Sequence, residues 1–119
     1  MKDTIFYLGT CDTCKRIIGQ IEDIDRFELR EIKSSGVTDS EIEAIHELSG
    51  LSYRDLFNKR ARKYKEIKEK LEQGDDTQYK AYIIQEYTFL KRPVVIYNDQ
   101  VFAGNAKKTV EHMLNTVNQ

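Results

Sequence analysis

Two cysteines, Cys11 and Cys14, are separated by two residues, directly after an apolar stretch and at the start of an amphipathic pattern. A disulfide that closes so short a loop would not cross-link distant parts of a fold, so the pair does not resemble the disulfide framework of a secreted protein. A cysteine at a helix N-terminus lies where free backbone N–H groups and the helix dipole favour an anion, which lowers the thiol pKa. We therefore expect Cys11 to be a nucleophile.

Cys14 follows one helical turn later, on the apolar stripe of the same predicted helix. In that position it can attack a mixed disulfide or adduct formed at Cys11 and release it. The alternative is that Cys14 is a small buried hydrophobic residue of the core. A zinc site would need His46 or His112, and neither has ligand-pair spacing, so we predict no metal.

A second candidate is Arg92, which precedes the only proline of the chain, Pro93. Because a proline has no N–H for the strand ladder, it must occupy a strand edge, a strand start or a cis bond. An arginine beside a thiolate lowers the thiol pKa and offers a planar fork to an oxyanion or a carboxylate. The alternative is a solvated arginine at the start of a strand.

A third candidate is the basic run over residues 59–65, which contains five cations, including Arg60. Such runs usually form a solvated helix face. The run is also where a second anion-binding arginine could originate, and charge alone does not decide between the two.

These residues must be positioned by the elements that the hydrophobic pattern predicts. Alternation and apolar runs predict strands over residues 4–8, 26–32, 93–97 and 100–103. Helical spacing and capping signals predict a helix from 11 whose apolar stripe reaches Ile21, a helix from 38 and a short helix over 52–58. Further helices are predicted from 64 and from 77, and a last amphipathic helix contains Val110, Met113, Leu114 and Val117. The order is thus β-α-β, a helical middle and β-β-α, which implies an α/β fold with a mixed four-stranded sheet and flanking helices.

The composition limits the classes of function. A chain of 119 residues has room for one domain, and 19 Lys and Arg against 20 Asp and Glu leave a charge of −1. We therefore expect no direct nucleic-acid binding and no attraction to an anionic membrane. No apolar run approaches the roughly 18 residues of a membrane span, and no cleavage pattern follows Met1. We expect a cytoplasmic monomer.

Three motifs in this order resemble the ArsC/Spx/YffB family. They are Gly9-Thr10-Cys11-Asp12-Thr13-Cys14-Lys15 after a strand, Leu56-Phe57-Asn58-Lys59-Arg60 in the helical middle, and Leu90-Lys91-Arg92-Pro93-Val94-Val95 before the last hairpin. The resemblance covers about residues 4–115. It implies a thioredoxin-like fold in a single domain, 1–119, with a helical insertion at about 37–88.

The resemblance also implies roles for particular residues. Cys11 matches the nucleophilic cysteine, which attacks arsenate in the reductases of the family. Arg60 and Arg92 match the arginines that hold the oxyanion or thiolate, Thr10 is expected to contribute to the same anion site, and Pro93 matches a cis-proline. The reductant would be glutathione with glutaredoxin, or thioredoxin, and no bound cofactor is implied.

Two departures from the reductase pattern define an alternative. The reductases have a third arginine after the last hairpin, where this chain has Gly104-Asn105-Ala106, and they commonly lack a cysteine at the position of Cys14. Spx regulators carry Cys-x-x-Cys as a redox switch and bind RNA polymerase, but they have a charged C-terminal extension that is not found after Gln119. We expect an arsenate reductase-like thiol-disulfide oxidoreductase acting on a small oxyanion or thiol substrate, with a Spx-like regulator as the alternative.

Overall fold

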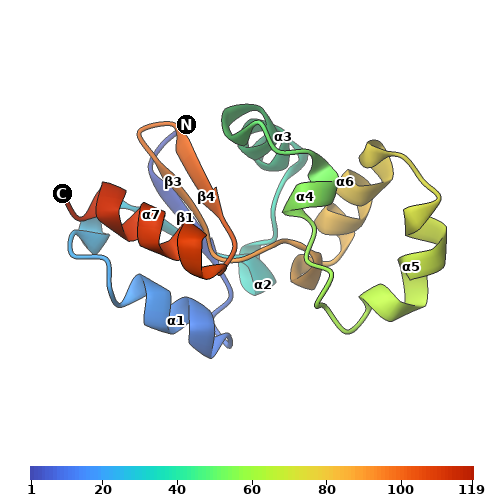
Figure 1. Ribbon diagram of the computed structural model, residues 1–119, viewed down its shortest axis with the longest axis horizontal. Coiled ribbons are helices and arrows are strands. Elements are labelled where there is room, and N and C mark those ends of the chain that lie inside the picture. Colours follow the sequence, from blue (N-terminus) through green and yellow to red (C-terminus); the bar gives the residue numbers. More distant parts are fainter. The chain divides into compact units, whose positions relative to one another are not determined.

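The computed structural model describes all 119 residues as four strands, seven α-helices and two short 3-10 helices (Figure 1). In chain order the elements are β1 (Thr4–Tyr7), α1 (Asp12–Ile18), η1 (Ile24–Arg26), β2 (Glu28–Glu31), α2 (Ile32–Ser35), α3 (Asp39–Ser49), α4 (Tyr53–Leu56), α5 (Tyr64–Glu72), α6 (Asp76–Gln85), η2 (Tyr87–Phe89), β3 (Val94–Tyr97), β4 (Gln100–Ala103) and α7 (Lys107–Val117).

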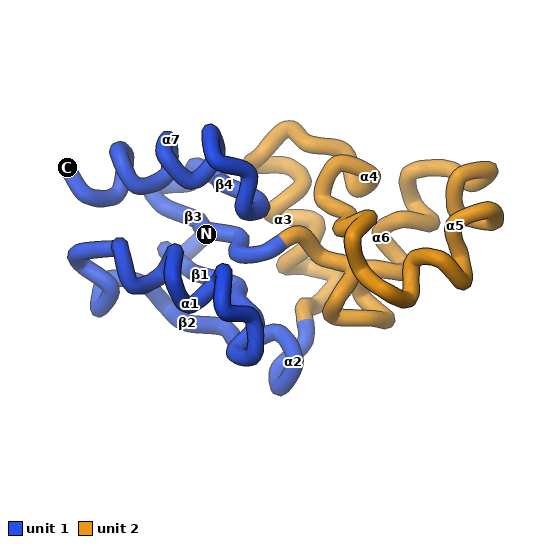
Figure 2. Tube along the Cα trace, turned by 60° about the horizontal axis from the view of Figure 1, so that its bottom comes forward, with its two compact units in different colours: residues 1–36, 92–119 blue, residues 37–91 orange.

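The chain divides into two compact units (Figure 2). The sheet unit, blue in Figure 2, comprises residues 1–36 and 92–119. The helical unit, orange, is the continuous segment 37–91, and the insertion predicted from the resemblance was placed at about 37–88.

The sheet unit contains one mixed sheet with the strand order β2-β1-β3-β4. β1 pairs with β2 in parallel and with β3 antiparallel, and β3 pairs with β4 antiparallel through a hairpin. Asn98 and Asp99 at the hairpin turn have φ values of 49° and 62°, which is the conformation that a two-residue hairpin of this kind requires. The predicted mixed four-stranded α/β sheet with flanking helices is confirmed.

The strand register brings the chemically interesting segments to one end of the sheet. Tyr7 at the end of β1 is paired with Glu31 at the end of β2, and Phe6 is paired with Val94 at the start of β3. The loop that leads to Cys11 therefore leaves the sheet at the same end at which the chain enters β3.

One face of the sheet is covered by α1 and α7, because residues of both helices share an apolar cluster with inward-facing strand residues. The buried members of this cluster are Ile5, Ile17, Ile21, Phe27, Val95, Phe102, Met113 and Val117. Residues that alternate with these along the strands, such as Phe6, Val94 and Ile96, are also fully buried. β1 is therefore buried on both faces, in agreement with its almost entirely apolar sequence.

The helical unit is built around α6, which packs against α3, α4 and η2. Both capping boxes of the chain lie here, at Thr38 with Glu41 and at Asp75 with Gln78, and each satisfies backbone N–H groups at the start of a helix. Phe57 is 1% exposed and is the centre of an aromatic cluster with Tyr64, Tyr79 and Phe89.

Three local predictions are wrong in informative ways. The helix predicted over 52–58 ends at Leu56, because Phe57 forms an antiparallel bridge with Leu90 instead. The apolar stripe that continues to Ile21 predicted a longer first helix, but α1 ends at Ile18, and Ile21 reaches the core from the following turn. The strand predicted over 26–32 is shorter, because β2 covers only Glu28–Glu31 and Ile32 begins α2.

None of the helices combines the length and the apolar character that crossing a membrane would require.

Candidate active site

Cys11 is the residue that caps the start of α1, with extended backbone angles of φ −91° and ψ 110°. A tight turn holds it in place, because its N–H donates to the Leu8 carbonyl at 3.0 Å while its own carbonyl accepts from Lys15 at 3.1 Å. Both cysteines are free thiols, and Cys11 is partly exposed whereas Cys14 is completely buried. The Cys11 thiol is therefore accessible, and the Cys14 thiol is shielded.

The electrostatics of the two thiols differ. Burial alone would raise the pKa of the Cys11 thiol. Hydrogen bonds from the Cys14 backbone N–H, the Cys14 thiol and the Arg92 side chain lower this pKa, as does the positive charge of Arg92, and together they outweigh the effect of burial. The pKa of Cys11 is therefore lowered from its ordinary value. Burial raises the pKa of the Cys14 thiol to about 11, and the neighbouring Cys11 adds to this rise. The pair thus consists of a thiolate-forming cysteine and a cysteine that keeps its proton.

Arg92 reaches Cys11 from the residue before β3. The peptide bond between Arg92 and Pro93 is cis, and the Pro93 carbonyl accepts from the Gly104 N–H at 2.9 Å. That hydrogen bond places the segment after β4, including Asn105, beside the Arg92–Pro93 segment. Asn105 occupies the position at which the resemblance led us to look for a third arginine.

Glu31 is a residue of this site that the sequence analysis did not identify. Its carboxylate accepts from the Gly9 N–H at 2.7 Å and from the Ser34 N–H at 2.8 Å, so it joins the Cys11 loop to the start of α2. These two backbone hydrogen bonds lower the pKa of the Glu31 carboxyl. A Cβ on Gly9 would lie 3.2 Å from the Glu31 carboxylate, so the glycine permits the close approach. The signal available in the sequence was a carboxylate at the end of the strand predicted to run beside β1.

The predicted site residues are distributed over both units. Cys11, Cys14, Arg92 and Pro93 lie together in the sheet unit, and Thr10 lies exposed in the turn before Cys11. Arg60 belongs to the helical unit. The roles of Arg60 and Thr10 in an anion site stay predictions.

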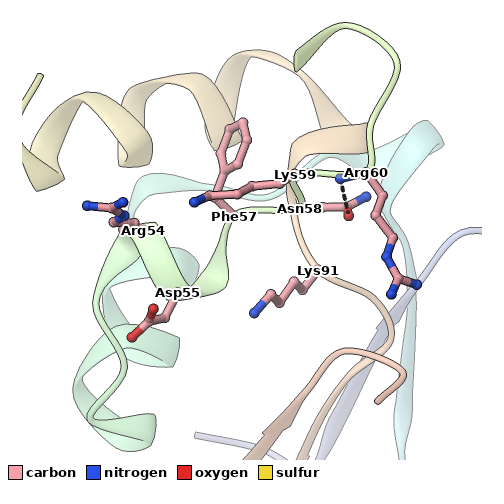
Figure 3. Close-up of a pocket in the computed structure, with 7 residues that line it drawn as sticks. All are labelled: Arg54, Asp55, Phe57, Asn58, Lys59, Arg60 and Lys91. Carbon is pink, nitrogen blue, oxygen red and sulfur yellow. Dashed lines mark hydrogen bonds between the residues drawn. The ribbon is translucent and has the colours of Figure 1, made fainter. Parts of the chain in front are cut away.

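Arg60 follows a segment whose backbone is firmly held. Asn58 donates its backbone N–H to the Phe89 carbonyl at 2.7 Å and its side-chain amide to the Thr88 carbonyl at 3.2 Å, and its side-chain oxygen accepts from the Arg60 N–H at 3.1 Å. The dashed line in Figure 3 marks the last of these. Asn58 therefore fixes the backbone conformation of the segment from which the Arg60 side chain extends.

The same segment lines a pocket of about 300 Å³ in the helical unit. Its lining residues are Arg54, Asp55, Phe57, Asn58, Lys59, Arg60 and Lys91. Four of the seven side chains are cationic and one is a carboxylate, so the pocket is positively charged. Nowhere in the chain do three or more His, Cys, Asp or Glu side chains form a group that could hold a metal ion.

The arrangement around Cys11 has the parts that thiol chemistry needs. A partly exposed thiol with a lowered pKa lies beside a guanidinium, and a second thiol lies within hydrogen-bonding reach of the first sulfur. Such a pair can alternate between two thiols and a disulfide, and the arginine can stabilise negative charge on the sulfur or on a bound anion. The fold is thioredoxin-like, and the site places two free thiols beside a guanidinium.

Comparison with known proteins makes this class more specific. The sequence pattern of the ArsC family matches residues 6–113, which is most of the chain. The chain therefore belongs to the ArsC family.

Individual relatives support the same assignment. The uncharacterized protein YusI of Bacillus subtilis is 28% identical over 108 residues, which cover 87% of this chain and 91% of the relative. A protein of Bacteroides fragilis described as related to the ArsC family is 25% identical, with a TM-score of 0.79 and coverage of 95% of this chain and 98% of that one. An arsenate reductase of Vibrio cholerae has the same fold, with a TM-score of 0.74 at 19% identity and 97% coverage of both chains.

Proposed function

We propose that this protein is a thiol-disulfide oxidoreductase in which the Cys11 thiolate attacks an oxidised substrate. The observation that carries this proposal is the set of hydrogen bonds to the Cys11 sulfur from Arg92 and Cys14, which lower the pKa of Cys11. A thiol with a lowered pKa is ionised at neutral pH to a larger extent and is the better nucleophile there. Family membership is the second support.

An arsenate substrate would be reduced in two steps. The Cys11 thiolate attacks arsenic, and a hydroxyl group of arsenate takes a proton from solvent and leaves as water, so that a sulfur–arsenic bond replaces an arsenic–oxygen bond. A second thiolate then attacks the Cys11 sulfur and forms a disulfide, while the electron pair of the sulfur–arsenic bond passes to arsenic. Two thiols are oxidised, and arsenic(V) is reduced to arsenic(III) and released as arsenite.

The second thiol is either Cys14 or glutathione. Cys14 is adjacent to Cys11, and its raised pKa of about 11 means that it must lose its proton during the attack. A disulfide between Cys11 and Cys14 would be reduced by thioredoxin, whereas a mixed disulfide of Cys11 with glutathione would be reduced by glutaredoxin.

The experiment that tests the proposal is arsenate-dependent consumption of NADPH. It is run once with glutathione, glutaredoxin and glutathione reductase, and once with thioredoxin and thioredoxin reductase. We expect turnover by the native chain to vanish in Cys11→Ser. The Cys14→Ser variant assigns the resolving thiol, because it loses turnover if Cys14 resolves and keeps it if glutathione does.

Other oxidised substrates are tested in the same coupled systems. A mixed disulfide of glutathione with a small thiol replaces arsenate, and the Cys11→Ser variant is again the control. Turnover with the disulfide but not with arsenate would retain the oxidoreductase and remove the arsenate substrate. Absence of turnover with both substrates in both systems would contradict the proposal.

A redox-sensing regulator is the second candidate, and the contact between the two thiols favours it. The Cys14 thiol donates a hydrogen bond to Cys11, so a disulfide between them requires little movement. If neither coupled system shows turnover while mild oxidation forms the Cys11–Cys14 disulfide, the regulator becomes the better proposal. Its test is then binding of RNA polymerase by the reduced and the oxidised chain.

A further inference from the structure

β2 is an edge strand, because the order β2-β1-β3-β4 leaves no strand beyond it (Figure 2). Its register with β1 determines which backbone groups face outward. The Glu28 N–H donates to the Asp3 carbonyl at 2.9 Å, which directs the backbone groups of Glu28 toward β1. Because the direction alternates along a strand, the groups of Arg30 also face β1, whereas those of the residue between them face away from the sheet.

The outward-facing groups are the Phe27 carbonyl, both backbone groups of Leu29 and the Glu31 N–H, because the C=O and N–H of each trans peptide point in opposite directions. None of these groups has a partner within the chain. The Phe27 N–H is engaged, since it donates to the Ile24 carbonyl at 3.1 Å. The Glu31 carbonyl is also engaged, since it accepts from the Ser35 hydroxyl at 3.0 Å. The edge therefore offers another strand a short and defined pattern of donors and acceptors.

The side chains of β2 add an apolar centre flanked by opposite charges. Leu29 is 48% exposed and points to the same face of the sheet as its pairing partner Ile5. Glu28 is exposed on the opposite face, and so is the guanidinium side of Arg30, which lies 5.5 Å from the centre of the Phe6 ring. A carboxylate and a guanidinium thus lie on one face, on either side of Leu29 along the strand.

We propose that two copies of this chain associate by antiparallel pairing of their β2 edges, with Leu29 on the two-fold axis. Each Leu29 then exchanges both of its backbone hydrogen bonds with Leu29 of the second copy. Each Glu31 N–H donates to the Phe27 carbonyl of the second copy. Glu28 lies directly opposite Arg30 of the second copy, in a pair without backbone hydrogen bonds, where facing side chains are closest.

The charge pattern selects this register over its neighbours. Antiparallel pairing centred on Glu28 or on Arg30 would keep backbone hydrogen bonds but would oppose two carboxylates or two guanidinium groups, which is destabilising. Pairing centred between two residues would set outward-facing groups opposite inward-facing ones and lose the backbone hydrogen bonds. The other edge strand, β4, has no charged side chain, so charge fixes no register there. The self-complementary edge therefore fits a second copy of the same strand.

This association does not rest on the proposed function, because it involves neither thiol. A strand of four residues provides a small contact, so we expect a weak dimer that forms toward high protein concentration. Measurements on dilute protein, such as alkylation of Cys11, then report the single chain.

The first test is sedimentation equilibrium of the native chain with a phosphine reductant present, so that no intermolecular disulfide contributes. We expect a monomer–dimer equilibrium between micromolar and millimolar concentration. Leu29→Lys places two ammonium groups at the axis and should weaken the dimer about tenfold or more. Leu48→Lys, which changes an exposed leucine of α3, is the matched control and should associate as the native chain does.

Exchange of the two charges tests the register. Glu28→Arg alone opposes two guanidinium groups, and Arg30→Glu alone opposes two carboxylates, so each variant by itself should remain monomeric. An equimolar mixture of the two variants should dimerise again, because every facing pair then joins a cation and an anion. Glu111→Arg, on the exposed face of α7, makes the same change in charge and should not affect the native dimer.

Amide hydrogen exchange locates the contact. As the protein concentration rises, exchange of the Leu29 and Glu31 N–H groups should slow, because both become hydrogen-bonded to the second copy. Exchange of the Arg30 N–H, which already bonds to β1, should change less.

Three outcomes would overturn the inference. They are a native chain that sediments as a monomer at all concentrations, a dimer that Leu29→Lys does not weaken, and a mixture of the two folded charge variants that stays monomeric. Arg30 also donates to the Ser35 hydroxyl and to the Gly36 carbonyl, so circular dichroism of Arg30→Glu must show that it folds. If it does not fold, Leu29→Lys and the amide exchange decide.

Discussion

The Cys11 thiol is acted on by opposing effects, since burial raises its pKa while hydrogen bonds and the charge of Arg92 lower it. The net lowering depends on a few polar contacts that single substitutions remove. The same neighbourhood has the opposite effect on Cys14, whose thiol is buried and lies beside a sulfur that ionises first. One pair of identical side chains therefore acquires two protonation behaviours from its surroundings.

Substitution of Arg92 should raise the pKa of Cys11. A lowered pKa means that thiolate persists as the pH falls toward that value, so the alkylation rate of native Cys11 should rise with pH through a midpoint below that of a free cysteine. In Arg92→Ala the midpoint should move to higher pH by about one unit. Stopped-flow alkylation with iodoacetamide across a pH series measures it, with Arg16→Ala as a control cation on α1. An unchanged midpoint would mean that Arg92 does not act on the thiolate.

Cys14 should resist alkylation in the folded chain. Its pKa of about 11 leaves it almost entirely protonated at neutral pH, and its side chain is completely buried. Mass spectrometry after treatment with iodoacetamide at neutral pH should therefore show one modification, at Cys11, and two after unfolding in guanidinium chloride. Modification of both cysteines in the folded protein would contradict the burial of Cys14.

At the scale of elements, the loop between β1 and α1 is positioned by the neighbouring strand. Glu31 at the end of β2 accepts from Gly9 and from Ser34, and the parallel register that pairs Tyr7 with Glu31 brings the carboxylate to this loop. Glu31 therefore acts on Cys11 by holding the backbone of its loop and is a positioning residue.

Removal of the Glu31 carboxylate should loosen the Cys11 loop. We expect Glu31→Ala to slow alkylation of Cys11 several-fold at neutral pH and to raise its midpoint, with partial recovery in Glu31→Gln, which keeps one acceptor. The free energy of unfolding should fall by about 1 kcal/mol. Glu28→Ala, an exposed residue of the same strand, is the control. A loss of stability with an unchanged alkylation midpoint would show a purely structural role.

The Asn58 side chain holds the backbone from Phe57 to Arg60 through hydrogen bonds, as the Glu31 side chain holds the Cys11 loop. Asn58→Ala removes the side-chain hydrogen bonds to Thr88 and Arg60, and we expect a loss of about 1 to 2 kcal/mol of stability. Urea unfolding measures the loss, and near-ultraviolet circular dichroism reports the aromatic cluster around Phe57. Asn115→Ala, on the exposed face of α7, should leave both signals unchanged.

The sequence predicted those elements whose determinants are local. The apolar run of β1, the capping box at Thr38 and the turn at Asn98 and Asp99 depend on neighbouring residues, and each prediction agrees with the structure. The extended conformation of Phe57 could not be predicted, because it depends on Leu90 far along the chain.

The same distinction applies to the candidate site. The spacing of the cysteines and the proline after Arg92 are visible in the sequence, and the structure brings these residues together. The position of Glu31 depends on strand register, and the pocket at Arg54 and Lys91 depends on backbone hydrogen bonds between distant segments. The hydrophobic pattern and the spacing of neighbouring residues do not specify strand register or hydrogen bonds between distant segments.

At the scale of the whole molecule, the sheet unit is discontinuous in sequence. β1 pairs with β3, and the whole helical unit lies between these two strands in the sequence. The central pair of the sheet is therefore formed by segments that are distant along the chain. Asp3 joins three parts of this unit near the hairpin turn. Its carboxylate accepts from Arg26 Nε at 2.6 Å and from the Asn98 N–H at 2.9 Å, and Arg26 also lies 4.3 Å from the centre of the Tyr97 ring.

The Asp3 network should make the stability of the sheet unit depend on pH in the acid range. Burial alone would raise the pKa of Asp3, but the hydrogen bonds from Arg26 and Asn98 lower it below its ordinary value of 3.8. A carboxyl whose pKa is lower in the folded state stabilises that state above the unfolded pKa, and the contribution is lost as the pH falls through the folded pKa.

Asp3→Asn should therefore reduce the free energy of unfolding by about 1 kcal/mol near neutral pH and much less in strong acid. Urea unfolding of both chains across the acid range measures the difference, and Asp25→Asn, an exposed change of equal charge, should show no such convergence. A difference between the Asp3→Asn and native chains that stays constant with pH would show that the shape of the side chain, and not its ionised hydrogen bonds, holds the turn.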